Sequence, residues 1–232
     1  MVQRFEVGTR MSEIAVHNGT TYLAGQVAHD ASQDIDGLSL TAGRFNEIST
    51  RESSDHEKLY LFTRPNGPRR PSDGLNFGGA TYAFSPNLSA SSFYGQLEDI
   101  YQQSYFNLLH SQRVGEWTLG ANLGYFIDRD DGQARIGDIQ SRTGYALLSA
   151  SHSGHTLYVG LQKVNGDSQW MSVYGSSGRT LGNDMFNGNF SNAGERSWQL
   201  RYDYDFKALG VPGLTFFTRY INGDSIKVPG SQ

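Results

Sequence analysis

Hydrophobic and polar residues alternate without a break along one ten-residue stretch, 197–206. One set of alternate positions is mostly aromatic and comprises Trp198, Leu200, Tyr202, Tyr204 and Phe206. The other set is polar or charged and comprises Ser197, Gln199, Arg201, Asp203 and Asp205. Because successive side chains of a β-strand point to opposite faces, this period of two predicts a strand with one apolar and one charged face. A connector at 207–213 leads to a second run at 214–223, so the two runs predict a hairpin.

Similar runs recur along most of the chain, and together they predict nine strands. The predicted strands are 38–44, 74–84, 88–97, 101–110, 117–127, 139–149, 155–164, 197–206 and 214–223. The clearest alternation lies in 117–127, where Trp117, Leu119 and Leu123 share one face and Asn122 lies on the other. Strands 88–97, 101–110 and 139–149 alternate less cleanly, so the pattern leaves their facing open.

The connections between these strands alternate in length. Short turns are predicted at 85–87, 111–116, 150–154 and 207–213, and longer loops at 45–73, 128–138 and 165–196, with one short exception at 98–100. Membrane barrels sort their connections in this way, with short turns on one side of the membrane and long loops on the other. A soluble antiparallel sheet, which the aromatic hairpin alone leaves open, has no reason to do so. The pattern therefore favours a transmembrane β-barrel.

Composition narrows the class further. No run approaches about 18 consecutive apolar residues, and mean hydropathy is −0.50, so no transmembrane helix is expected. Cysteine is absent, which excludes disulfides and cysteine metal sites. The net charge of −4, without a basic stripe, excludes nucleic acid as an expected partner.

Candidate catalytic chemistry is sparse. The run Asp55-His56-Glu57 places one histidine between two carboxylates in a charged loop, a pattern more typical of a solvated surface than of a metal site. The sequence has no phosphate-binding glycine loop, paired-histidine zinc motif or nucleophile motif. We therefore expect no catalytic residue, no metal and no cofactor.

Residues 1 to about 36 have a different character. Asn18-Gly19 between two apolar runs predicts a hairpin. This opening resembles the start of the YjgF/RidA family, chiefly through Tyr22-Leu23-Ala24-Gly25-Gln26-Val27-Ala28. The resemblance implies a fragment of an enamine/imine deaminase. The later segment in which that family carries its substrate-binding arginine has no counterpart, so we predict a hairpin without that activity.

The remainder, from about Leu38 onward, resembles the OprD family of outer-membrane porins. Motifs that carry the resemblance follow in family order: Leu40-Thr41-Ala42-Gly43-Arg44-Phe45, Gly95-Gln96-Leu97-Glu98-Asp99-Ile100-Tyr101, Gln162-Lys163-Val164-Asn165-Gly166-Asp167 and Gly194-Glu195-Arg196-Ser197-Trp198-Gln199-Leu200-Arg201-Tyr202-Asp203. The resemblance implies passive diffusion of small solutes, often carboxylates, along a lumen with a basic track. It also implies a barrel of about eighteen strands, of which this chain would supply about half.

These observations define the expectations for the structure. The fold is expected to be all-β: a RidA-like hairpin at 1–36 and an incomplete antiparallel porin barrel at 37–232, joined as a fusion or truncation product. Solute-guiding cations are expected at Arg201, Arg219 and Lys163. The expected partners are small solutes and outer-membrane lipid, with a monomer favoured over an oligomer. The expected location is the outer membrane, although the N-terminus has no segment of signal-peptide character. The alternatives are a deaminase fragment and an inactive soluble β-rich product.

Overall fold

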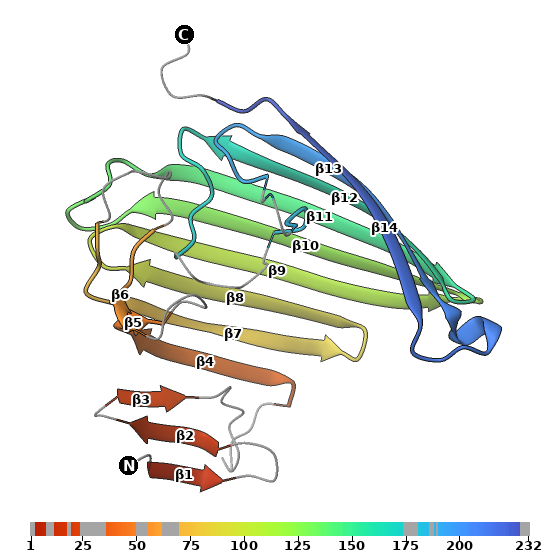
Figure 1. Ribbon diagram of the computed structural model, residues 1–232, viewed down its shortest axis with the longest axis horizontal. Helices are drawn as coiled ribbons and strands as arrows, with labels where there is room; N and C mark the ends of the chain where they lie inside the picture. The colour runs from red at the N-terminus through yellow and green to blue at the C-terminus, as the bar shows by residue number, and fades with distance from the viewer. Residues whose placement is uncertain are drawn as a thin grey trace.

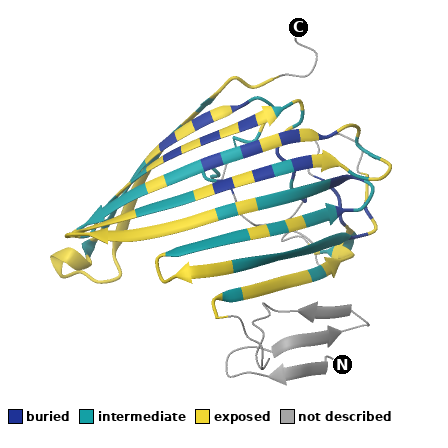
Figure 2. Ribbon diagram, turned by 180° about the vertical axis from the view of Figure 1, so that it is seen from behind, coloured by how far each residue is buried: buried dark blue, intermediate teal, exposed yellow. Residues whose placement is uncertain are grey.

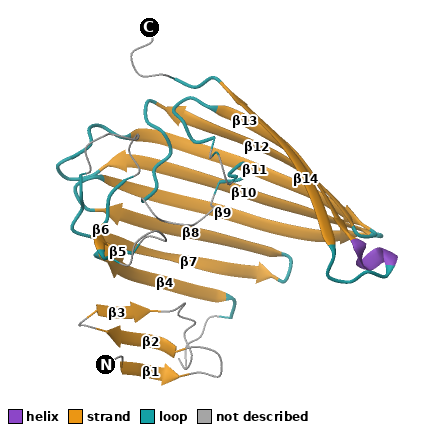
Figure 3. Ribbon diagram, in the orientation of Figure 1, coloured by secondary structure: helices purple, strands orange, loops and turns teal. Residues whose placement is uncertain are grey.

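The computed structural model describes residues 3–7, 12–17, 20–23, 36–49, 55–61, 70–173, 181–185, 188 and 190–227, with side chains from residue 36 onward. None of the described residues belongs to a helix long and apolar enough to cross a bilayer. The described part of the chain is built almost entirely of antiparallel strands (Figure 3).

Nine strands form one antiparallel sheet that curves into a trough (Figure 1). They are β4 (Leu38–Phe45), β7 (Leu75–Ser85), β8 (Leu88–Leu97), β9 (Tyr101–Val114), β10 (Trp117–Asp130), β11 (Gln140–His152), β12 (His155–Gly166), β13 (Arg196–Asp205) and β14 (Thr215–Asp224). Each of the nine pairs with the next of the nine along the chain, from β4, which pairs with β7, at one edge to β14 at the other. The prediction of an incomplete nine-stranded antiparallel barrel is confirmed.

The strand ends differ modestly from those predicted. Strands β9, β10 and β11 run to 114, 130 and 152, beyond the predicted ends at 110, 127 and 149, because their ladders continue past the point where the alternation weakens. Phe206 was predicted on the apolar face of a strand, but it begins a short 3₁₀ helix, η1 (Phe206–Leu209).

Two smaller sheets accompany the trough. Strands β1 (Gln3–Val7), β2 (Ser12–His17) and β3 (Thr20–Leu23) form a three-stranded sheet, and β5 (Glu47–Ile48) pairs with β6 (Glu57–Lys58). The predicted N-terminal hairpin is present, since β2 pairs with β3 and His17 lies opposite Thr20. The turn residues Asn18 and Gly19 lie outside the described residues.

The connections are sorted by length between the two ends of the sheet (Figure 1). The turns after β7, β9 and β11 and the connector containing η1 lie at one end, which we call the turn end. The connections 46–74, 98–100, 131–139 and 167–195 lie at the other, the loop end. The predicted alternation of short and long connections is thus confirmed, including its one short exception at 98–100.

The two faces of the sheet carry different side chains. On the outer, convex face, Leu123 of β10 is 39% exposed and Trp198 of β13 is 45% exposed. On the inner, concave face, Phe126 is 2% exposed and Gln199 is 2% exposed. Buried and exposed positions alternate along the strands (Figure 2). The apolar sides of the strands therefore face outward, as the sequence predicts for a membrane barrel and not for a soluble core.

The register also determines the facing that the sequence left open. Tyr101 and Tyr105 of β9 lie on the inner face because they pair with inner residues of β10. Leu97 of β8 pairs with Tyr101 and therefore lies on the inner face as well. Their neighbours Gln96, Gln102 and Phe106 therefore lie on the outer face.

The buried core lies on the inner face at the loop end. One cluster joins Leu59 and Leu61 of the first long loop to Leu97 and Ile100 of the wall and to Met171 of the last long loop. Leu61 and Val173 form a bridge between the two loops. Leu59, Tyr60 and Leu61, an apolar run within the charged first loop, are buried, while Phe62 lies outside the described residues. The sequence does not predict that parts of both loops fold inward.

Candidate functional site

Two arginines lie side by side on the inner face near one edge of the sheet. Arg201 of β13 and Arg219 of β14 are directly opposite each other in the ladder. Both are partly exposed toward the hollow of the trough. The structure thus brings together two of the three cations that the sequence singled out.

Arg201 is held in one orientation by its surroundings. Its guanidinium donates two hydrogen bonds to Asp203, from Nε at 2.7 Å and from Nη2 at 2.6 Å. The two residues are two positions apart on one strand, so both project from the same face. The Arg201 Cζ lies 5.1 Å from the ring centroids of Tyr158 and Phe217, one on each neighbouring strand. Aromatic contact and the paired carboxylate pre-orient the guanidinium and offset part of its charge.

Arg219 contacts the last long loop. Its Nη1 donates to the backbone carbonyl of Asp184 at 3.2 Å. The loop segment is anchored nearby by Asn183, whose backbone N–H donates to Gln162 Oε1 at 3.0 Å and whose side chain donates to Ser197 Oγ at 2.9 Å. Asn183 is fully buried, so these bonds satisfy a polar group that would otherwise destabilise the fold. Residues 181–184 therefore narrow the trough beside the two arginines.

A second anchor fastens the loop at Trp170 and Met171. The carboxylate of Asp128 accepts hydrogen bonds from Ser141 Oγ at 2.8 Å, from Gln103 Nε2 at 2.8 Å and from the Met171 backbone N–H at 3.2 Å. Asp128 is 1% exposed, and its three donors compensate the cost of burying it. The anchor ties β9, β10, β11 and the loop together at one point.

Aromatic packing completes this contact. Phe126 stacks on Tyr105 with ring centroids 4.3 Å apart and meets the edge of Trp170 at 5.4 Å. Tyr145 lies against the wall, and its hydroxyl is 3.0 Å from that of Tyr105. The wall can accept Tyr145 because Gly124 lies beneath it: a Cβ added at Gly124 would come within 2.1 Å of the Tyr145 ring.

Lys163 lies elsewhere. It alternates with the buried Gln162 and Val164 of β12, and it is exposed on the outer face in phase with Leu157, Val159 and Leu161. Its partner in the ladder is Arg196, also on the outer face. The prediction that Lys163 lines the inner face is therefore wrong about its position, because the period of two places it with the apolar row.

A third polar cluster braces the loop end. Arg44 of β4 donates to both carboxylate oxygens of Glu98, and the longer of these hydrogen bonds is 3.0 Å. Asn76 donates to the same carboxylate at 3.0 Å. The Arg44 guanidinium, with help from Asn76, holds the pKa of Glu98 below its ordinary value. The cluster links β4, β7 and the short connection after β8.

In the run at 55–57, Asp55 and His56 are exposed and Glu57 is partly exposed. His56 Nδ1 lies 4.0 Å from Glu47, and both side chains are largely exposed. No group of three or more metal-ligating side chains occurs within the described ranges. The residues that shape the inner face, notably Asp128, Asn183 and Gln199, had no local signal in the sequence beyond their positions on or near polar faces of strands.

Comparison with known proteins gives a consistent picture. The family described as outer membrane porin, OprD family, matches residues 22–232. The porin-like protein GalP of Pseudomonas putida is 46% identical over 208 residues, which cover 89% of this chain and 50% of GalP.

Solved porins have the same fold. The structure of Pseudomonas aeruginosa OpdK with vanillate superposes with a TM-score of 0.80 at 57% identity, covering 85% of this chain and 52% of OpdK. Pseudomonas aeruginosa OccK2 (OpdF) in complex with glucuronate gives a TM-score of 0.81 at 49% identity, covering 85% and 53%. This chain therefore spans about half the length of each of these proteins.

Proposed function

This chain belongs to the OprD family of outer membrane porins, and we propose that it forms part of the wall of an outer-membrane channel. The channel passes small carboxylate-bearing solutes by passive diffusion. The observation that carries this proposal is the division of the sheet into an exposed apolar outer face and an inner face that mixes polar and apolar side chains and onto which parts of two loops fold. A soluble sheet would bury the apolar face instead.

The height of the apolar band fits a bilayer. Along β10 the outer face is apolar from Trp117 to Ile127. Ten steps at about 3.4 Å each, in a strand tilted by about 45°, give a height of roughly 24 Å. Barrel proteins of the outer membrane carry an apolar band about 25 Å tall.

The solute class follows from the inner face. Arg201 and Arg219 present two guanidinium groups to the trough, and guanidinium groups bind carboxylates with two parallel hydrogen bonds. Vanillate and glucuronate, which accompany the OpdK and OccK2 structures, both carry a carboxylate. These facts support a carboxylate as the solute, with Arg201 and Arg219 as the guiding residues.

The direct test is conductance across planar bilayers exposed to the refolded chain. We expect discrete current steps that persist and that carry potassium glucuronate as well as potassium chloride. A chain that only aggregates, or that raises conductance without steps, would contradict the proposal.

A matched pair of substitutions tests the assignment of the two faces. Leu108 and Leu109 are adjacent on β9 and comparably exposed, at 37% and 44%, but Leu108 lies on the outer face and Leu109 on the inner face. Leu108→Arg is expected to destabilise the inserted protein by about 2–4 kcal/mol, because the charge enters hydrocarbon, whereas Leu109→Arg places it in water.

The measurement is equilibrium unfolding of each variant in lipid vesicles. Equal destabilisation by the two substitutions would mean that water, and not lipid, covers the outer face.

We propose no enzymatic activity for the chain. The resemblance of residues 1–36 to RidA deaminases supplies a strand pattern only, and the OprD match already begins at residue 22. Release of ammonia from an amino-acid-derived enamine by the purified chain would favour the deaminase instead. The division at 36/37 and the monomeric state stay predictions.

A further inference from the structure

A row of polar side chains crosses the outer face at the loop end. From β4 to β9 it consists of Arg44, Asn76, Gln96 and Gln102, each opposite the next in the ladder. Gln102 is in turn opposite Arg129 of β10. The row lies just beyond the apolar band, at the level where a bilayer changes from hydrocarbon to headgroups.

Across β10 to β12 the row becomes cationic. Arg129, Arg142 and Lys163, which we call the rim cations, lie on three successive strands and are exposed on the outer face. Arg129 and Arg142 are diagonal neighbours, as are Arg142 and Lys163, because Arg142 pairs with Ile127 and with Asn165. Diagonal neighbours are about 7–8 Å apart, so the three charges form one compact group.

Within the described part of the chain, the rim cations have no carboxylate partner, unlike the neighbouring outer-face cations Arg44 and Arg196. Arg44 is paired with Glu98, and Arg196 is paired with Asp224 at 2.9 Å. Among the described residues, no hydrogen bond or ion pair engages the side chain of Arg129, Arg142 or Lys163. Like charges this close repel one another unless an anion lies between them.

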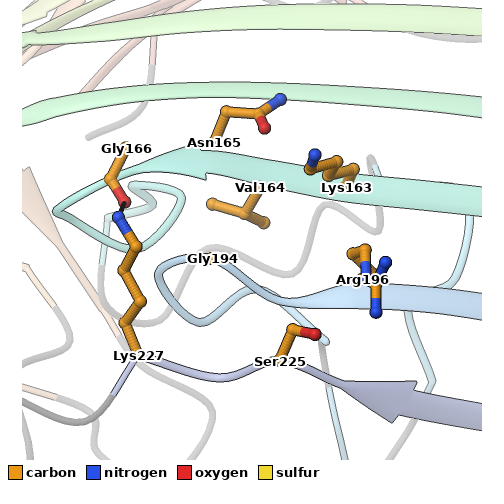
Figure 4. A pocket seen from close by; sticks show the side chains of 8 residues that line it. All are labelled: Lys163, Val164, Asn165, Gly166, Gly194, Arg196, Ser225 and Lys227. Carbon is orange, nitrogen blue, oxygen red and sulfur yellow. Dashed lines mark hydrogen bonds between the residues drawn. The ribbon is translucent and has the colours of Figure 1, made fainter.

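A hollow on the outer face lies beside the rim. It measures about 440 Å³. Ala146, Leu161 and Trp198 line it toward the bilayer, and Lys163 and the ion pair of Arg196 with Asp224 line it toward the loop end. A second hollow of about 360 Å³ continues past Lys163 toward Lys227 (Figure 4). Lys227 is itself paired with Asp167 at 2.9 Å. A hollow with an apolar floor and the Lys163 cation at its loop-end border matches a lipid molecule, which has an apolar chain and a charged head.

We propose that the rim cations, with the hollow at Trp198, form a binding site for an anionic lipid headgroup in the membrane leaflet at the loop end. The headgroup phosphate lies between Arg142 and Lys163, and an acyl chain follows the hollow past Leu161. This inference rests on the proposed function, since it requires the outer face to lie in a bilayer. Basic residues at a membrane surface attract anionic lipid in this way.

Tryptophan fluorescence provides a local test. Of the three tryptophans, Trp198 lies beside the rim, Trp117 lies on the outer face at the turn end, and Trp170 is buried on the inner face. In a Trp117→Phe background, the refolded chain is placed in vesicles containing bromine-labelled phosphatidylglycerol or bromine-labelled phosphatidylcholine. Quenching then reports which lipid lies against Trp198.

We expect phosphatidylglycerol to quench Trp198 preferentially. Because each cation contributes about fivefold, Arg142→Gln/Lys163→Gln should lower that preference about 25-fold. The matched control keeps Trp117 in a Trp198→Phe background, where the double substitution should change nothing. An unchanged preference at Trp198 would overturn the lipid site while leaving the channel proposal intact. Absence of quenching by either lipid would overturn both, because the outer face would then not lie in the bilayer.

Discussion

Removing both inner-face cations, as Arg201→Gln/Arg219→Gln, is expected to lower the anion-to-cation permeability ratio of the channel about fivefold. The two guanidinium groups attract anions through water, where each charge contributes about 0.5 kcal/mol at 8 Å. Loss of both charges changes the energy of an anion by about 1 kcal/mol and that of a cation by the same amount in the opposite direction. Salt about halves the resulting difference of about 2 kcal/mol, which leaves about 1 kcal/mol, or the fivefold change. The measurement is the reversal potential of single channels under a gradient of potassium chloride or potassium glucuronate.

Asp203 offers a control of opposite sign. Its carboxylate accepts two hydrogen bonds from Arg201 and offsets part of that charge. Asp203→Asn should therefore raise the anion-to-cation permeability ratio of the channel. If both variants shift the reversal potential in one direction, the change reflects a distorted wall and not the charge of the arginines.

The second large effect is expected from Phe126→Ala. Phe126 is 2% exposed and packs between Tyr105 and Trp170, so its removal leaves a cavity under the inward-folded loop. Truncation of a buried phenylalanine costs about 3–5 kcal/mol. The free energy of unfolding in vesicles should fall by that amount, and the backbone amides of Trp170 and Met171 should exchange hydrogen faster.

Phe106→Ala is the matched control for this substitution. Phe106 lies on the outer face of β9 and is 47% exposed, so lipid can fill the space that it leaves. Its cost should be less than half that of Phe126→Ala, with no change in amide exchange at Trp170. Equal costs would mean that the loop contributes little to holding Phe126 in place.

Much of the fold could be predicted because it is encoded by a local property. In a strand, the direction of a side chain depends only on whether its position is odd or even, so the alternation around Trp198 and Leu123 predicts both the strand and its outward face. Lys163 follows the same rule, although we expected it among the solute-guiding cations. It is in phase with Leu157 and Leu161, and this spacing already pointed to the outer face.

The inward folding of the loops could not be predicted in the same way. Asp128, Ser141 and the amide of Met171 meet at one point although 43 positions separate Asp128 from Met171. Leu61 and Val173 form a bridge across a still longer separation. No periodicity links such residues, since their contact depends on how the whole sheet curves.

The sequence by itself determined the nine strands, their antiparallel order, the ends at which turns and loops lie, and the apolar face. These follow from the two-residue period and from the lengths of the connections, which each stretch of chain carries independently. The tertiary structure decided which charges stand together: Arg201 beside Arg219 on the inner face, and Arg142 beside Lys163 on the outer face. Ladder register brings residues from different strands to one level, and register is set by the pairing of whole strands, so the separate runs do not contain it.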